Sequence, residues 1–332
     1  MTMRVTMGSL VLLCAIAIAA PAAADQKRPA TKKPAAKAAQ KKGPEAPVVD
    51  TRALQTQVML DRAGYSPGEI DGTMGSSTTR ALDAYIKNGG KADALPGDAV
   101  TAYTITAQDA AGPFTPKIPE DMVEKSKLTA LGYSNLLEAL GERFHCSPSL
   151  LKRLNPTAKF AAGESIQVPG VTATVQPVGP PRGRQSDAVP SADNPAATTI
   201  TVKKSTSDLI VVDGAGKVLM YAPVTTGSEH DPLPIGEWKV TGVQRDPKFH
   251  YNPALFWDAE PGHSKATIPP GPNNPVGVVW IDITREHYGL HGTPEPGAIG
   301  KTESHGCVRL TNWDALKLAS LVRQGTRVVF AE

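Results

Sequence analysis

The C-terminal part of the chain alternates apolar and polar residues in short runs. The first runs are rich in β-branched residues, and the later ones alternate in the same way. This pattern predicts half-buried β-strands. The expected strands cover residues 199–202, 209–212, 218–224, 237–243 and 276–283.

One helix is predicted in the same region, directly after residue 310. Thr311 is a suitable N-cap residue, and Asp314 stands at the position that a capping box gives to an acidic side chain. The expected buried face of this helix is Ala315, Leu318 and Val322. Gly325 is expected to end it. We therefore predict a mostly-β domain with one packed helix over residues 198–332.

Helical spacing of apolar residues marks the preceding part of the chain. Leu54 and Val58 lie on one face of a short amphipathic helix that ends at Gly64, and a second helix is predicted over residues 79–86. Turn-forming residues separate the two helices. A small helical domain is therefore expected over residues 48–108.

A second small module, of α+β type, is predicted over residues 118–170. Its first helix carries the apolar stripe Leu136, Leu137 and Leu140. Ser147 and Pro148 begin another helix, and residues 163–169 return as a short strand. The chain is thus expected to be multidomain, as its 332 residues also suggest.

Residues 1–24 have the pattern of a secretory signal peptide, with Arg4 followed by an apolar run at 11–20. This run is shorter than the roughly 20 residues that a membrane-spanning helix needs. Residues 25–47 are rich in Ala, Lys and Pro and predict a disordered tether. A Pro-, Gly- and Ser-rich segment at 171–197 predicts a linker. The sequence does not fix the cleavage site.

The net charge of +3 comes from the tether, which carries seven basic and two acidic residues. Lys-rich tails can bind nucleic acid, but export argues against that partner. A solvated linker is the simpler interpretation. The signal pattern predicts an exported protein.

A thiol and two imidazoles supply the chemistry for acyl transfer through a thioester. Cys307 follows His305 by two positions, and His291 lies sixteen positions before the cysteine. A cysteine nucleophile needs a base to remove its proton and a neighbour that stabilises the thiolate. We expect Cys307 to be that nucleophile.

The strand pattern around the cysteine favours His291 as the base. If the strand extends back through Gly306, then His305, Cys307 and Arg309 share one face, with side chains about 7 Å apart. Contact between His305 and Cys307 would then require a backbone turn at Gly306. His291 arrives on a separate segment, so His305 is expected to shape the site or to touch substrate.

Backbone amides near the cysteine are candidates for an oxyanion hole. Gly306 permits a tight turn, so that the amide of Cys307 and its neighbour could point at a developing oxyanion. Arg309, on the pocket face, is expected either to lower the thiol pKa or to bind a substrate carboxylate. A structural ion pair is the alternative for Arg309.

The sequence His291-Gly292-Thr293, a loop, and then Ser304-His305-Gly306-Cys307-Val308-Arg309-Leu310 resembles the signature of the L,D-transpeptidase (YkuD-type) catalytic domain. The resemblance covers residues 198–331. It implies that Cys307 is the nucleophile and that His291 donates and accepts the proton, oriented by the carbonyl of Gly292. Ser304, His305, Gly306 and Arg309 would shape the site. No cofactor and no metal are implied.

The N-terminal modules also resemble known families. Leu54, Tyr65, Gly72 and their neighbours are similar to a peptidoglycan-binding domain. Residues 154–156 and 166–169 are similar to parts of a LysM carbohydrate-binding module, although the usual opening strand is not visible. Peptidoglycan stem peptides and glycan are the implied partners. A degenerate spacer is the alternative for the LysM-like module.

The resemblance implies an enzyme that cross-links tetrapeptide stems with release of D-Ala, or that attaches an outer-membrane protein to the wall. A carboxypeptidase or endopeptidase on the same site, a wall-binding protein with an inactive domain, and a zinc hydrolase using His291, His305 and Cys307 are the alternatives. The sequence decides neither the acceptor nor the oligomeric state.

Two further features complete the predictions. Cys146 is expected to be an unpaired core residue, because Cys307 must stay free to react. The long Pro- and Gly-rich segment at 249–274 is expected to be a lid or a binding surface, in which Phe256 and Trp257 could line the substrate groove.

Overall fold

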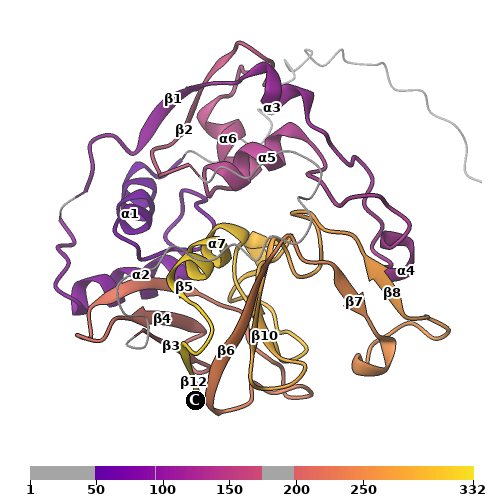
Figure 1. Ribbon diagram of the computed structural model, residues 1–332. Helices are drawn as coiled ribbons and strands as arrows, with labels where there is room; N and C mark the ends of the chain where they lie inside the picture. The colour runs from indigo at the N-terminus through magenta and orange to yellow at the C-terminus, as the bar shows by residue number, and fades with distance from the viewer. Residues whose placement is uncertain (1–48, 94, 174–197) are drawn as a thin grey trace, which may run out of the picture. The chain divides into compact units, whose positions relative to one another are not determined.

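The computed structural model describes residues 49–93, 95–173 and 198–332 (Figure 1). The predicted signal peptide, the tether and almost all of the linker at 171–197 lie outside these ranges. Within them, no helix has the length and apolar character needed to cross a membrane.

Eight strands of the C-terminal region form one sheet in the order β11-β10-β9-β6-β12-β3-β4-β5. Their bounds are β3 (Thr199–Lys203), β4 (Asp208–Val212), β5 (Val218–Pro223), β6 (Gly236–Arg245), β9 (Val279–Ile283), β10 (Gly289–His291), β11 (Val308–Arg309) and β12 (Arg327–Ala331). The pairs β12–β3 and β10–β11 are parallel, and the other pairs are antiparallel. The expected mostly-β fold of this region is confirmed.

The helix α7 (Asn312–Leu321) packs against β9 and β10 and closes the core of the sheet. The Thr311 hydroxyl oxygen accepts a hydrogen bond from the Asp314 amide at 3.2 Å, as the predicted N-cap requires. The predicted inner face is buried, with Leu318 fully inaccessible to solvent. The helix ends at Leu321, four residues before the predicted end at Gly325.

The five predicted strands appear as β3, β4, β5, β6 and β9, of which β5 ends one residue before its predicted end and β9 begins late. Strand β9 begins at Val279 and not at residue 276, because the preceding residues form turns and Gly277 adopts a positive φ of 60°. The alternation around Cys307 also predicted a strand, which appears as the two-residue β11, whereas the sequence pattern missed the three-residue β10 and it missed β12.

The N-terminal described region contains short helices and one two-stranded sheet. Its elements are α1 (Thr51–Arg62), α2 (Ser76–Lys87), β1 (Val100–Thr104), α3 (Ala107–Ala111), α4 (Met122–Lys125), α5 (Leu136–Arg143), α6 (Pro148–Leu154) and β2 (Ser165–Pro169). Strand β1, within the predicted helical domain, pairs antiparallel with β2 of the predicted α+β module. The domain boundaries and the LysM-like assignment stay predictions.

One edge of the large sheet is covered by the N-terminal region. The amide of Ser66 donates to the carbonyl of Tyr221 in β5, and the amide of Tyr221 donates to the carbonyl of Gly64, both at 2.9 Å. The Ser66 hydroxyl donates to the Asp314 carboxylate at 2.8 Å. The two backbone bonds pair the amide and the carbonyl of Tyr221, which an uncovered edge strand would leave without partners.

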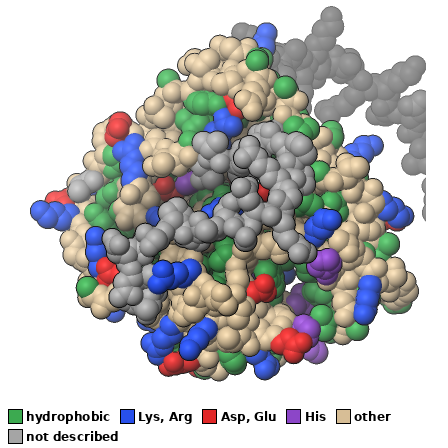
Figure 2. All heavy atoms as spheres, in the orientation of Figure 1, with side chains coloured by type: hydrophobic (Ala, Val, Ile, Leu, Met, Phe, Trp, Pro, Cys, Tyr) green, Lys and Arg blue, Asp and Glu red, His purple; other side chains and the backbone are tan. Residues whose placement is uncertain are grey.

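A second, smaller pair of strands extends from the sheet region. Strands β7 (Phe249–Tyr251) and β8 (Ala266–Ile268) pair antiparallel and carry a long connection with a 3₁₀ turn, η2 (Pro253–Leu255). Basic and acidic side chains are interspersed over the face shown in Figure 2, and histidines gather on the side where Figure 1 places β7 and β8.

Candidate active site

Strands β10 and β11 bring the candidate residues to one face of the sheet. In their parallel pairing Leu290 lies opposite Val308, and His291 lies opposite Arg309. Leu290 and Val308 belong to the buried core, so the alternating side chains of His291 and Arg309 project to the other face. That face opens into a pocket of about 1140 Å³, which His291, Ser304, His305, Cys307 and Arg309 all line.

The backbone turns sharply just before the cysteine. Gly306 has a φ of 101°, and a Cβ at this position would lie 2.5 Å from the Tyr288 ring. Glycine is therefore required both by the backbone conformation and by the close ring. Of the two possibilities that the sequence left open, the structure shows the backbone turn at Gly306 and not a strand extended back through it, since β11 begins only at Val308.

Ser304 fixes the geometry of this turn with its hydroxyl group. Its Oγ accepts a hydrogen bond from the Gly306 amide at 3.2 Å and donates one to the Cys307 carbonyl at 2.6 Å. Ser304 is itself almost fully buried. The Gly306 amide, predicted as an oxyanion donor, therefore already has an acceptor in this structure.

His291 is held as a neutral imidazole. Its Nδ1 lies 2.6 Å from the carbonyl of Gly292, and its ring stacks on Trp280 with centroids 5.4 Å apart. A carbonyl only accepts, so Nδ1 must carry the proton and Nε2 keeps its lone pair. Burial lowers the pKa of His291 to about 3; the Gly292 carbonyl opposes this shift and the Arg309 charge adds to it.

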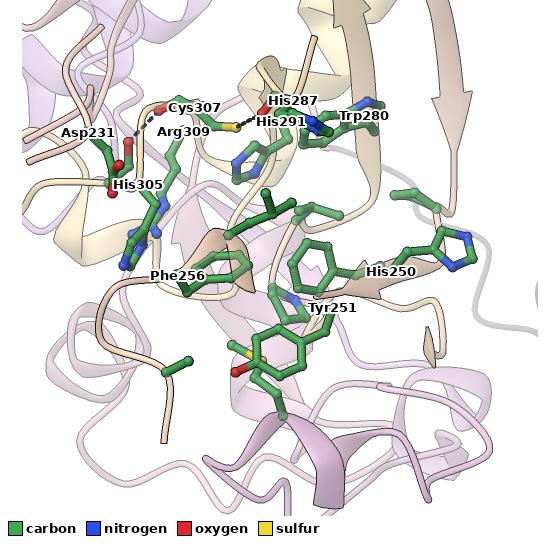
Figure 3. A pocket seen from close by; sticks show the side chains of 18 of the residues that line it. Asp231, His250, Tyr251, Phe256, Trp280, His287, His291, His305, Cys307 and Arg309 are labelled. Carbon is green, nitrogen blue, oxygen red and sulfur yellow. Dashed lines mark hydrogen bonds between the residues drawn. The ribbon is translucent and has the colours of Figure 1, made fainter. Parts of the chain in front are cut away.

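Cys307 is half-buried and free of any disulfide. Burial raises the pKa of its thiol to about 11, while a backbone hydrogen bond from Gly289 and the charge of Arg309 act in the opposite direction. The Sγ lies 3.8 Å from the carbonyl oxygen of His287. In Figure 3 the thiol points toward the side of the pocket that holds His287 and His291.

Arg309 brings a positive charge into the pocket. Its pKa is lowered by burial, and Cys307, Glu295 and Asp258 act to raise it. No salt bridge within 4.0 Å joins Arg309 to a described acidic residue. The guanidinium therefore remains a candidate group for a substrate carboxylate.

His305 faces a different part of the pocket. Its Nε2 lies 2.8 Å from Asp258, and its ring meets Phe256 edge-on with centroids 5.0 Å apart. Both partners belong to the β7–β8 connection. Trp257 of the same connection stacks on His230 at 4.8 Å and remains 62% exposed. His305 thus holds the segment that the sequence predicted as a lid or a binding surface.

One wall of the pocket comes from outside the sheet region. Glu120, Asp121 and Met122 line it, and Asp121 lies 2.7 Å from His263 of the β7–β8 connection. An apolar cluster that includes Met122, Leu131, Tyr251 and Ile268 joins the two segments. Sequence reasoning missed this wall, because nothing local marks a contact between segments more than one hundred residues apart.

Three further pocket features carried no recognisable sequence signal. Trp280 stacks on His291, Tyr288 packs beneath Gly306, and Asp258 pairs with His305. Across the described ranges, no group of three or more His, Cys, Asp or Glu side chains is arranged to hold a metal ion. His291, His305 and Cys307 accordingly do not form such a group.

Comparison with known proteins identifies the family of this chain. The family model for the YkuD L,D-transpeptidase catalytic domain matches residues 197–330. The YkuD protein of Bacillus licheniformis, which bears an L,D-transpeptidase name, is 29% identical over 195 residues, covering 58% of this chain and 91% of that protein. YqjB of Bacillus subtilis, similarly named, is 31% identical over 144 residues, covering 42% of this chain and 73% of its own.

A solved structure of L,D-transpeptidase 3 from Mycobacterium tuberculosis with a faropenem-derived adduct is also similar, at 19% identity and a TM-score of 0.35. The match covers 41% of this chain and 60% of that one, less than two thirds of its length. From the family match and the named relatives, the chain belongs to the L,D-transpeptidase family and carries its YkuD catalytic domain at residues 197–330.

Proposed function

We propose that the protein is an exported, periplasmic L,D-transpeptidase that joins peptidoglycan stem peptides through a thioester on Cys307. The observation that carries this proposal is the state of His291. A neutral imidazole with Nδ1 bonded to the Gly292 carbonyl has only Nε2 left as a base, on the side of the pocket toward which the Cys307 thiol points.

The first half-reaction releases D-Ala. His291 Nε2 takes the thiol proton as Sγ attacks the carbonyl carbon that joins the third stem residue to the terminal D-Ala. The negative charge that develops on the carbonyl oxygen is stabilised by the Cys307 amide, because the Gly306 amide is already bonded to Ser304. The imidazolium then protonates the leaving amine of D-Ala, and the thioester remains.

The second half-reaction forms the cross-link. A neutral amine of a second stem attacks the thioester carbonyl, His291 takes the proton lost by that amine, and the thiolate leaves and is reprotonated. The pocket volume of about 1140 Å³ lies slightly above the usual range for sites that hold one small ligand.

Intact-mass spectrometry with faropenem tests the nucleophile. We expect a covalent adduct on the wild-type protein and none on the Cys307→Ala variant. Cys146→Ala is the matched control, since Cys146 is the other described free thiol and is fully buried in an apolar cluster; it should retain the adduct. An adduct that survives Cys307→Ala, or none on the wild type, would contradict the proposal.

Product analysis tests the acceptor. Incubation with purified tetrapeptide-bearing muropeptides should give cross-linked dimers that have lost one D-Ala. Free tripeptide as the main product would instead identify water as the acceptor and make the protein a carboxypeptidase on the same site. A conjugate of the stem peptide with an added outer-membrane protein fragment, formed in place of dimers, would redirect the proposal toward protein attachment.

A further inference from the structure

The buried carboxyl group of Glu142 lies outside the catalytic domain but reaches the network around His291. Glu142 is on α5, which lies next to α7 (Figure 1), and its residue is only 8% exposed. Its Oε1 is fully buried and has no hydrogen-bond partner among the described residues. The side chain of Asn312, the first residue of α7, is a neighbour of this carboxyl group and lowers its pKa.

Asn312 links that carboxyl group to the backbone beneath the pocket. Its Oδ1 accepts a hydrogen bond from the Val278 amide at 3.2 Å, and its Nδ2 lies 3.2 Å from the Pro272 carbonyl. The residue is 1% exposed. A Cβ at Gly277 or Gly292 would lie only 2.0 or 2.1 Å from Oδ1, so both glycine backbones pack directly on the Asn312 amide.

Gly292 is the residue whose carbonyl fixes the tautomer of His291. Its amide in turn donates to the Val279 carbonyl at 3.2 Å, next to the Val278 amide that Asn312 binds. A rotation of the Asn312 side chain would therefore either bring it into steric conflict with the Gly292 backbone or break its hydrogen bond with the Val278 amide. The position of the Gly292 carbonyl, which accepts the hydrogen bond from His291, therefore depends on the orientation of the buried Asn312 side-chain amide.

We propose that Glu142 is a positioning residue for His291, which acts by holding the Asn312 side-chain amide in the orientation that packs against Gly292. The proposal rests on His291 being the base of the proposed function. It also assigns a role in the reaction to α5, which lies outside residues 197–330.

The charge state of Glu142 agrees with this role. The pKa of Glu142 is raised to about 8, chiefly by burial. The interaction with Asn312 opposes this shift, and the charges of Glu138 on the same helix and Glu69 on the α1–α2 connection add to it. The charge of Glu142 also contributes to raising the pKa of Tyr133. At neutral pH the group is therefore protonated, and it ionises only as the pH rises through about 8.

Nuclear magnetic resonance of the His291 ring nitrogens tests the proposal independently of activity. With the signals assigned through a His291→Gln variant, the wild type should show the Nδ1-protonated tautomer alone. Glu142→Ala should broaden these signals or mix the tautomers, whereas Glu142→Gln, which retains an acceptor oxygen, should restore the wild-type spectrum. Unchanged His291 signals in Glu142→Ala would overturn the proposal.

Two further measurements keep the test decisive if Glu142→Ala folds poorly. The His291 signals of the wild type should shift as the pH passes about 8, and those of Glu142→Gln should not; an identical titration of both proteins would overturn the proposal. Leu151→Ala is the destabilising control, because Leu151 packs in a cluster that contains no residue of 198–332. It should leave the His291 spectrum unchanged.

Acylation rates complete the test. Glu142→Ala should slow adduct formation about tenfold, the effect of losing one buried hydrogen bond, while Glu142→Gln should stay within about twofold of wild type. If neither the wild type nor any variant forms an adduct, the proposed function fails. The nuclear magnetic resonance spectra then still test whether Glu142 positions His291. If adducts form at equal rates with unchanged spectra, only the positioning role fails.

Discussion

The two histidines of the pocket occupy contrasting surroundings. His291 is 4% exposed, stacks on a tryptophan of the sheet and bonds to a backbone carbonyl one residue away. The His305 side chain is 24% exposed and bonds to Asp258, a half-exposed carboxylate on a long connection. A proton acceptor needs a fixed tautomer and a free nitrogen, which the sheet side provides. The connection side provides a partly exposed contact between two side chains.

Removal of each histidine gives the largest contrast. His291→Gln should slow acylation of Cys307 by about 10²- to 10⁴-fold, the usual contribution of a general base. His305→Gln should slow it by less than about tenfold, because His305 bonds to the β7–β8 connection. Time-resolved intact-mass measurements with faropenem provide both rates. Equal losses in the two variants would remove the distinction between the histidines.

The turn that separates His305 from Cys307 should respond to a single methyl group. Gly306→Ala adds a Cβ that would lie 2.5 Å from the Tyr288 ring at a φ of 101°. We expect acylation to slow by at least about tenfold, because a displaced thiol loses its alignment with the base. The same rate measurement and a thermal melt report the two consequences separately.

Gly325→Ala is the matched control for that substitution. Gly325 has a φ of 90°, and no atom lies within 4 Å of a Cβ placed there. It should cost about 1 kcal/mol of stability through the backbone alone and leave acylation unchanged. Slow acylation in Gly325→Ala would mean that general destabilisation, and not the turn at Gly306, explains the loss.

Asp258→Asn probes the connection side of the pocket. It removes the charge opposite His305, and exposed pairs of this kind are worth less than about 1 kcal/mol. We expect the apparent affinity for a stem peptide to fall only a few-fold, with little change in the maximal rate. Steady-state kinetics separate these quantities. A large fall in the maximal rate would place Asp258 with the reacting groups.

The pH profile should show the smallest change of all. The pKa of His291 is about 3 and that of Cys307 about 11, so neither group changes its proton occupancy between about pH 5 and 9. Acylation should therefore be nearly flat between about pH 5 and 7, below the range in which Glu142 ionises, and fall at lower pH, as His291 is protonated. A rise centred near pH 6.5, the ordinary value for histidine, would indicate a solvent-exposed base instead.

Local patterns in the sequence predicted much of the catalytic fold. Alternation located five strands, and the capping pattern at Thr311 located α7, because these depend on neighbouring residues. The alternation around Cys307 predicted the strand that appears as β11, but β10 spans only three residues and carried no periodic signal. Their pairing exists only through contacts across the sheet.

The candidate site divides in the same way. Cys307, His291 and the Gly292 carbonyl were predicted from the family resemblance, and their roles stay predictions for the experiments above. The orientation of His305 was not predicted, since it follows from the positive φ of Gly306 and from a contact with Asp258, 47 residues earlier. Glu142 and the wall at 120–122 depend on contacts between distant segments, which carry no local pattern.

The position of β12 has a consequence for the order of folding. It follows every other strand of the sheet in the chain, yet it lies between β6 and β3, in the interior of the strand order. Until it is inserted, the sheet consists of two separate halves, and β10 and β11 belong to the half that lacks β3, β4 and β5. A chain made from its N-terminus onward therefore completes this sheet only after the last strand has emerged. His291 of β10 and Cys307 beside β11 lie in the same half, so the thiol and its base can come together before β12 joins that half to β3, β4 and β5.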